Sequence, residues 1–118
     1  MPLTNDFLHG KFEQAMPYDE YVATGDARRR ENWKGFHEQV ALTEEQRALI
    51  AAFVRPINVL VSSGIWCGDC VQQCPILHHI EQARSDLVRV RFVDRDEHAD
   101  LAEKIMLCGG LRVPVAVF

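Results

Sequence analysis

Residues 57–70, INVLVSSGIWCGDC, decide the fold, because they lead from a buried strand to a pair of cysteines at the start of a helix. Residues 57–61 are nearly all apolar and mostly β-branched, which predicts a strand buried on both faces. We expect a helix from Cys67 to Ala83. A C-x-x-C pair is therefore predicted at a strand-to-helix junction.

This placement suits thiol–disulfide exchange, whose nucleophile is a thiolate. Cys67 is predicted to face the unpaired N–H groups and the positive dipole end of the helix, which would lower its pKa. Cys70, one helical turn further on, should be more buried and should resolve a mixed disulfide. The negative charge of Asp69 opposes thiolate formation at Cys67, so we expect a reductant rather than a strong oxidant.

Beyond the cysteines the sequence alternates between strand and helix. We expect a strand over residues 88–93, a helix over 99–106 that Cys108-Gly109-Gly110 ends, and a final strand over 113–118 that begins near Pro114. The first two strands, joined by a helix, should pair in parallel through a right-handed crossover.

The first half of the chain is predicted to be helical. Pro17 can open one helix, Asp26 can cap a second, and Thr43 begins a capping-box sequence ahead of a third. These helices are expected over residues 18–23, from 26 toward 37, and from 43 toward 53. We therefore divide the chain into a helical N-terminal extension, residues 1–55, and a core, residues 56–118.

Composition limits the possible functions. The 118 residues carry 13 Lys and Arg against 17 Asp and Glu, a net charge of −4, which is the size and charge content of one ordinary globular domain. The acidic balance disfavours nucleic acid and anionic membranes as partners. The sequence shows neither a secretory signal nor an apolar stretch near the ~20 residues of a membrane span, so we expect a cytoplasmic protein.

Three motifs together resemble the thioredoxin family. Residues 66–70, Trp-Cys-Gly-Asp-Cys, match its W-C-G-P-C with Asp in place of Pro, and Pro75 matches its helix-kinking proline, five residues after the second cysteine. Val113-Pro114 resembles its cis-proline and the preceding residue, whose backbone pairs with bound substrate. The resemblance covers residues 57–118 and implies an α/β thioredoxin-like sandwich, with a mixed sheet flanked by helices.

The resemblance implies a thiol–disulfide oxidoreductase that reduces protein disulfides, with Cys67 as nucleophile and Cys70 as resolving thiol. The residues implied to frame the substrate site are Trp66, Gly68, Asp69, Val113 and Pro114. The expected partners are disulfide-containing proteins and a reductase or small thiol as electron donor, because no G-x-G-x-x-G nucleotide loop is present. We expect no bound cofactor, no metal, no nucleic acid and no membrane.

Two departures from the family pattern matter. Val61 stands six residues before Cys67, where the family usually has a buried Asp, so proton handling must differ, through Asp69 or water. The family also continues past the proline strand with a further strand and helix, whereas this sequence ends at Phe118. Either those elements are missing from this sequence, or a partner or the N-terminal helices cover the strand edge.

A second hypothesis keeps the fold but makes the protein a binding module. The long N-terminal extension would then be a docking surface, and the cysteines would sense redox state or hold a metal. The spacing of Cys67 and Cys70 suits zinc, but no second pair of the required spacing follows. The remaining ligands would come from Cys74, His78, His79 or Cys108. Cys74 itself is open to two interpretations, a packed small side chain or a regulatory third thiol.

Overall fold

The computed structural model describes residues 4–105 and 113–118. Residues 106–112 contain Cys108 and the Cys108-Gly109-Gly110 sequence predicted to end the last helix, so these predictions lie outside the described residues.

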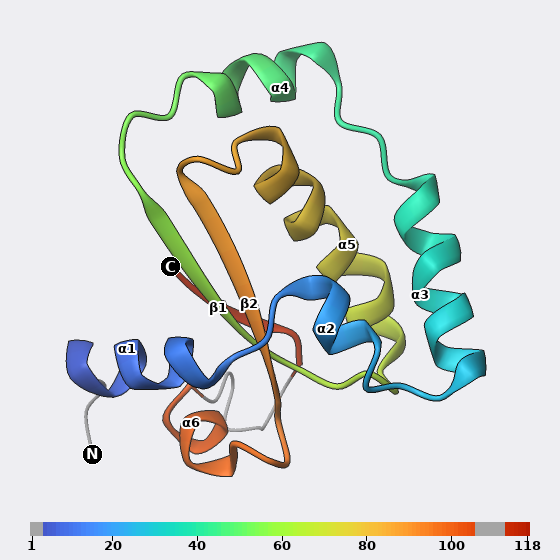
Figure 1. Cartoon of the computed structure of the whole chain (residues 1–118), viewed down its shortest axis with the longest axis vertical. Helices are drawn as coiled ribbons and strands as arrows, with labels where there is room; N and C mark the ends of the chain where they lie inside the picture. The colour runs from blue at the N-terminus through green and yellow to red at the C-terminus, as the bar shows by residue number, and fades with distance from the viewer. Residues whose placement is uncertain (1–3, 106–112) are drawn as a thin grey trace.

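The described residues contain a three-stranded mixed sheet in the order β2-β1-β3 (Figure 1). Its strands are β1 (Ile57–Ser63), β2 (Val88–Asp94) and β3 (Val115–Val117). β1 and β2 pair in parallel from Ile57 opposite Val88, as predicted, and β3 pairs antiparallel with β1, with Val61 opposite Ala116. The predicted α/β class and mixed sheet are therefore confirmed.

One face of the sheet is covered by three helices. α5 (Gly68–Ala83) connects β1 to β2 and packs with α2 (Tyr18–Val22) and α3 (Ala27–Gln39) over this face (Figure 1). Side chains alternate along a strand, so every second residue of β1 and β2 points into this layer. The buried strand residues in this cluster are Val59, Val61, Val88, Val90 and Phe92.

The other face is covered by α1 (Asn5–Gln14) and α6 (Ala99–Lys104). Leu60 and Val93, which point to this side, pack with Phe12 and Leu101. The chain after α1 also pairs with β2, since Met16 and Phe92 exchange two backbone hydrogen bonds of 2.9 and 2.7 Å. Helices from both halves of the chain thus enclose the sheet.

The helix starts follow the capping chemistry of the sequence. Asp26 caps α3 by accepting from the N–H of Arg29, and α4 (Glu44–Ala51) begins with a complete capping box between Thr43 and Gln46. Pro17 precedes α2, as predicted. No helix in the described part of the chain combines the length and the apolar character needed to cross a bilayer.

Candidate active site

A short loop carries the chain from the end of β1 to the cysteines. The N–H of Cys67 donates to the carbonyl of Gly64 at 3.0 Å, which closes this loop, and Cys67 is the N-cap residue of α5. A Cβ atom on Gly64 would lie 2.6 Å from the ring of Trp66, so a side chain at this position would require the ring to shift.

The N-terminal helices hold this loop from the other side. Trp33 of α3 is 1% exposed, and its indole N–H donates to the carbonyl of Ile65 at 2.9 Å. Gly25 also approaches Ile65, because a Cβ at Gly25 would lie 2.9 Å from its side chain. Sequence reasoning did not identify Trp33 or Gly25 as supports of the site.

The predicted site residues occupy different parts of this region. Cys67 is half-buried, whereas Cys70 is fully buried, as the sequence predicts. The Cys67 sulfur lies 4.0 Å from the carbonyl oxygen of Val113, and the Val113–Pro114 peptide bond is cis. Val113 and Cys67, which are 46 residues apart, therefore meet as the family resemblance implies.

The other predicted site residues surround Cys67 in sequence and are more exposed. Gly68 and Asp69 form the first turn of α5, and both are exposed. A Cβ on Gly68 would touch nothing within 4 Å, so packing does not require glycine there. The Trp66 side chain is 46% exposed, and the Arg95 guanidinium lies 4.9 Å from its ring centre.

The ionisation of the two thiols differs from the expectation based on helix position. The pKa of Cys67 is raised, chiefly because partial burial disfavours the thiolate, although backbone N–H groups of Cys70 and Asp69 oppose this effect. The pKa of Cys70 is lowered to about 6, chiefly by its interaction with the neighbouring Cys74 thiol and also by the Gly64 N–H, which donates to its sulfur at 3.5 Å. The prediction of a lowered pKa at Cys67 is therefore wrong, because burial outweighs the helix N-terminus there.

Cys74 belongs to a buried group of polar side chains behind Cys70. Cys74 and Ser63 are both 0% exposed, and the Ser63 hydroxyl lies 3.8 Å from the Cys74 sulfur. Tyr21 donates to the same hydroxyl at 3.1 Å. Sequence reasoning missed Ser63 and Tyr21; the available signal was that Ser63 lies two residues beyond Val61 on the same face of β1.

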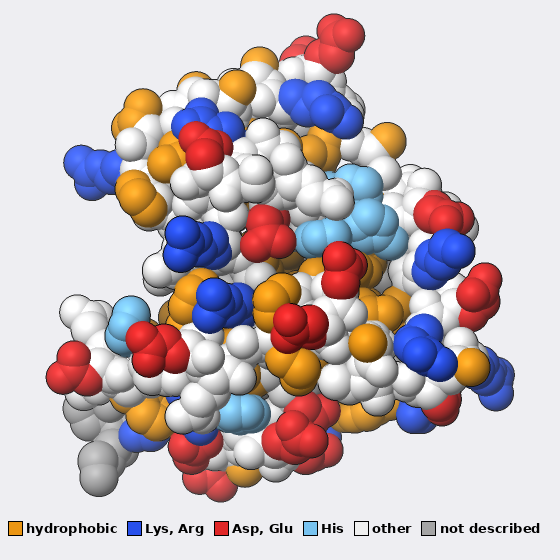
Figure 2. All heavy atoms as spheres, in the orientation of Figure 1, with side chains coloured by type: hydrophobic (Ala, Val, Ile, Leu, Met, Phe, Trp, Pro, Cys, Tyr) orange, Lys and Arg blue, Asp and Glu red, His pale blue; other side chains and the backbone are white. Residues whose placement is uncertain are grey.

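The histidines of α5 pack against α3. His37 Nε2 lies 2.8 Å from His78 Nδ1, and His79 Nε2 lies 2.9 Å from the His37 carbonyl oxygen. Figure 2 shows their side chains as one patch between these helices.

Within residues 4–105 and 113–118, no group of three or more His, Cys, Asp or Glu side chains is arranged to share a metal ion.

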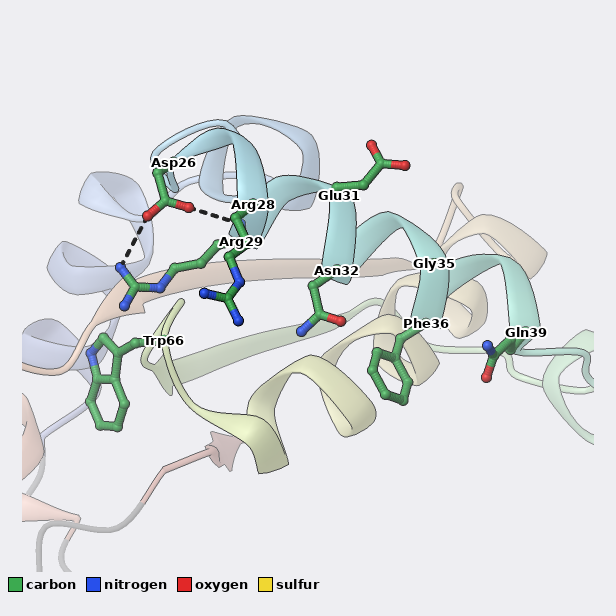
Figure 3. Close-up of a pocket in the computed structure, with 9 residues that line it drawn as sticks. All are labelled: Asp26, Arg28, Arg29, Glu31, Asn32, Gly35, Phe36, Gln39 and Trp66. Carbon is green, nitrogen blue, oxygen red and sulfur yellow. Dashed lines mark hydrogen bonds and ion pairs between the residues drawn. The ribbon is translucent and has the colours of Figure 1, made fainter.

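An open groove of about 730 Å³ lies between α3 and Trp66. Figure 3 shows Arg28, Asn32 and Phe36 directed from α3 toward this space, with Trp66 on its other side. Arg29 forms an ion pair of 3.6 Å with Asp26 at one end. The three arginines at 28–30 are exposed, and two of them, Arg28 and Arg29, line the groove beside Trp66.

The sheet is mixed and covered on both faces, a C-x-x-C pair lies between β1 and α5, and a cis-proline precedes β3. Together these features define the thioredoxin-like class of proteins. The chain belongs to the thioredoxin family, because a family model described as Thioredoxin matches residues 15–118. That match includes most of the helical first half as well as the core. The chain has no match among curated proteins.

Two solved structures share the fold. A protein of unknown function from Pseudomonas aeruginosa is 16% identical, with a TM-score of 0.78 over 89% of this chain and 64% of that chain. An HIV epitope-scaffold is 17% identical, with a TM-score of 0.76 over 89% of this chain and 65% of that chain. The chain thus spans less than two thirds of either protein, and at these identities the likeness shows the fold alone.

Proposed function

We propose that this protein is a thiol–disulfide oxidoreductase that reduces disulfides of other proteins through Cys67 and Cys70. The observation that carries the proposal is the half-buried Cys67 sulfur beside the Val113 carbonyl, with the fully buried Cys70 one helical turn behind it. An accessible attacking sulfur backed by an inaccessible resolving sulfur is the arrangement that disulfide exchange requires.

In the first step, the Cys67 thiol passes its proton to the Cys70 thiolate and attacks one sulfur of the substrate disulfide. A bond forms between Cys67 and that sulfur, and the other substrate sulfur leaves as a thiolate and takes the proton back from Cys70. This assignment agrees with the directions of the two pKa shifts, since burial raises the pKa of Cys67 and hydrogen bonds lower the pKa of Cys70.

In the second step, the Cys70 thiolate attacks Cys67 in the mixed disulfide. The Cys67–Cys70 bond forms and the remaining substrate sulfur leaves as a thiolate, so two electrons have moved from the dithiol to the substrate. An external reductase or small thiol must then restore the dithiol, and a reducing compartment such as the cytoplasm suits that cycle.

The surroundings of Cys67 suit a polypeptide substrate. The backbone of Val113 can pair with an extended chain, and the half-exposed Trp66 offers an apolar surface beside the reacting sulfur. The groove along α3 continues from Trp66 and could be followed by the chain on one side of the substrate disulfide.

The test is a thiol–disulfide equilibrium of the metal-free protein in defined redox buffers, with mass spectrometry of the bonded pair, together with reduction of a protein disulfide. We expect a reversible Cys67–Cys70 bridge and loss of turnover in both Cys67→Ser and Cys70→Ser. Cys70→Ser should accumulate the mixed disulfide on Cys67, and Cys67→Ser should form none.

Activity that survives Cys67→Ser would contradict the proposal. A bridge that involves Cys74 or Cys108 in place of this pair, or a stoichiometric metal lost in Cys67→Ser, would instead support the redox-sensing or metal-binding module.

A further inference from the structure

Trp66 lies between the cysteine loop and the groove along α3 (Figure 3). Its ring packs against Gly64 around the atoms Nε1, Cε2 and Cζ2, which a Cβ on that glycine would approach to 2.6–3.0 Å. Nearly half of the Trp66 side chain is nevertheless open to solvent. The orientation of the ring beside Cys67 therefore depends on the few groups that touch it.

The guanidinium of Arg95 lies over this ring. Its central carbon is 4.9 Å from the ring centre, within the ~6 Å over which a cation is attracted to an aromatic face. Among aromatic side chains, tryptophan attracts cations most strongly, and the planar guanidinium can stack flat on its ring. The Arg95 side chain is only 25% exposed, and partial removal from water strengthens a contact of this kind.

The turn after β2 fixes the position of Arg95. Its N–H donates at 2.9 Å to the carbonyl of Ser63, the residue that ends β1 just before the cysteine loop. The Asp94 carboxylate accepts from the N–H groups of Asp96 and Glu97 at 2.9 and 3.1 Å, which closes the turn. The Asp96 carboxylate in turn accepts from Arg95 Nε at 3.2 Å and restricts the orientation of the guanidinium. The segments that carry Trp66 and Arg95 therefore leave the sheet side by side, where Ser63 lies opposite Asp94.

We propose that Arg95 is a positioning residue of the substrate site, which holds the indole ring of Trp66 beside Cys67 by stacking its guanidinium on the ring. The inference rests on the proposed function for its effect on turnover, but the stacked pair is a property of the free protein. A ring that is already ordered gives the substrate an apolar surface that binding does not have to arrange. The effect of Arg95 is therefore on substrate binding and not on the exchange step at the sulfur.

The first test measures the order parameters of the indole N–H groups by ¹⁵N NMR relaxation, in reduced protein without substrate. The chain has two tryptophans, and Trp33, which is 1% exposed and bonded to the Ile65 carbonyl, is an internal reference. We expect Arg95→Gln to lower the order parameter of Trp66 and to leave that of Trp33 unchanged. Arg95→Lys should fall between Arg95→Gln and the wild type, because an ammonium group is attracted to the ring but cannot stack flat on it.

Arg91→Gln is the matched control. Arg91 lies on β2, and its guanidinium stands 4.6 Å from the ring centre of Phe12 on α1 and donates to the Phe12 carbonyl at 3.2 Å. This variant removes the same kind of contact between an arginine and an aromatic ring, but on the face of the sheet that α1 covers. The order parameters of both indoles and the reduction of disulfides should equal those of the wild type.

Steady-state kinetics separate a positioning role from a role in the chemistry. Arg95→Gln should raise the KM for a protein disulfide about two- to fivefold, which is the size expected for the loss of a partly exposed contact between a cation and a ring. Its kcat and its reaction with a small disulfide reagent should stay nearly unchanged. In a Trp66→Leu background, Arg95→Gln should raise KM no further, because the ring through which Arg95 acts is absent.

An unchanged Trp66 order parameter in Arg95→Gln would overturn the proposal. An equal rise in KM with and without the Trp66 ring would overturn it as well, since Arg95 would then bind the substrate directly. The order parameter is measured without substrate, so the two proposals can fail separately. A Trp66 ring that loosens in Arg95→Gln, in a protein whose wild type reduces no disulfide, would refute the proposed function and leave the stacked pair standing.

Discussion

At the scale of single residues, glycines determine how closely the active-site loop folds. Gly64 and Gly68 stand on either side of Cys67, but only Gly64 is in contact with a side chain, the ring of Trp66. The sequence alone does not distinguish the roles of the two glycines. Their different roles depend on where the Trp66 ring lies, which is decided by the folded loop.

We therefore predict that Gly64→Ala displaces the Trp66 ring. The variant should lose about 1–2 kcal/mol of unfolding free energy through overpacking and should reduce protein disulfides more slowly, because Trp66 flanks Cys67. Urea unfolding and initial rates measure both effects. The control is Gly68→Ala, which should be neutral or stabilising by up to about 1 kcal/mol; equal losses in the two variants would contradict the steric explanation.

At the scale of secondary-structure elements, capping and periodicity predicted most helices and both long strands. Asp26 and Thr43 cap α3 and α4 as their sequences indicate. The contact between α3 and α5 was not predicted, because His37 and His78 come from segments 41 residues apart. The sequence offers His78 and His79 as possible metal ligands under the binding-module hypothesis, whereas in the structure they pack against His37 of α3.

The α3–α5 contact predicts a loss of stability in mild acid. Burial, the largest cause, lowers the pKa of both His37 and His78, although Asp19 opposes the effect at each of them. Below the ordinary histidine pKa, ~6.5, the unfolded chain takes up protons that the folded protein still refuses, so unfolding becomes easier as pH falls. The loss should level off once pH falls below the lowered pKa values of the folded state.

The measurement is urea unfolding between pH 7.5 and 5, for the wild type and for His37→Gln with His78→Gln. Because the Cys70 thiolate also titrates in this range, both proteins are compared with the Cys67–Cys70 pair oxidised. The double variant should lose less stability on acidification than the wild type. Parallel pH profiles would show that these histidines do not cause the loss.

At the scale of the whole molecule, the two halves of the chain build the site together. The core contributes the cysteines and Val113, while α3 contributes Trp33 under the loop and one wall of the groove. The first half was predicted as an extension, packed on the core. In the structure its helices contact the loop that carries the nucleophile, and one of them lines the space beside Trp66.

We predict that filling the groove weakens substrate binding without changing the chemistry at Cys67. Gly35 lines the groove, and a Cβ there would touch nothing within 4 Å, so Gly35→Gln should fold normally and extend its side chain into the groove. The KM for a protein disulfide should rise several-fold with kcat nearly unchanged, while reaction with a small disulfide reagent stays the same.

The matched control is Gly10→Gln in α1, a helical glycine that is also without neighbours within 4 Å. Both variants should gain a similar unfolding free energy, about 0.5–1 kcal/mol, because glutamine favours a helix more than glycine does. A difference in KM between them therefore cannot come from stability. A KM that is unchanged in Gly35→Gln, or raised equally in both variants, would show that the substrate does not use the groove.

The sequence by itself determined the fold class, the parallel pairing of β1 and β2, the helix caps and the pair of thiols at the start of α5. The caps and the thiol pair depend on local spacing, since capping and the C-x-x-C motif are properties of neighbouring residues, and the parallel pairing follows from the order strand–helix–strand along the chain. Only the tertiary structure decided that burial raises the pKa of Cys67, that Ser63 and Tyr21 lie behind Cys70, and that α3 borders the site. Burial and hydrogen bonding depend on groups brought together from distant parts of the chain, and local sequence does not encode those distances.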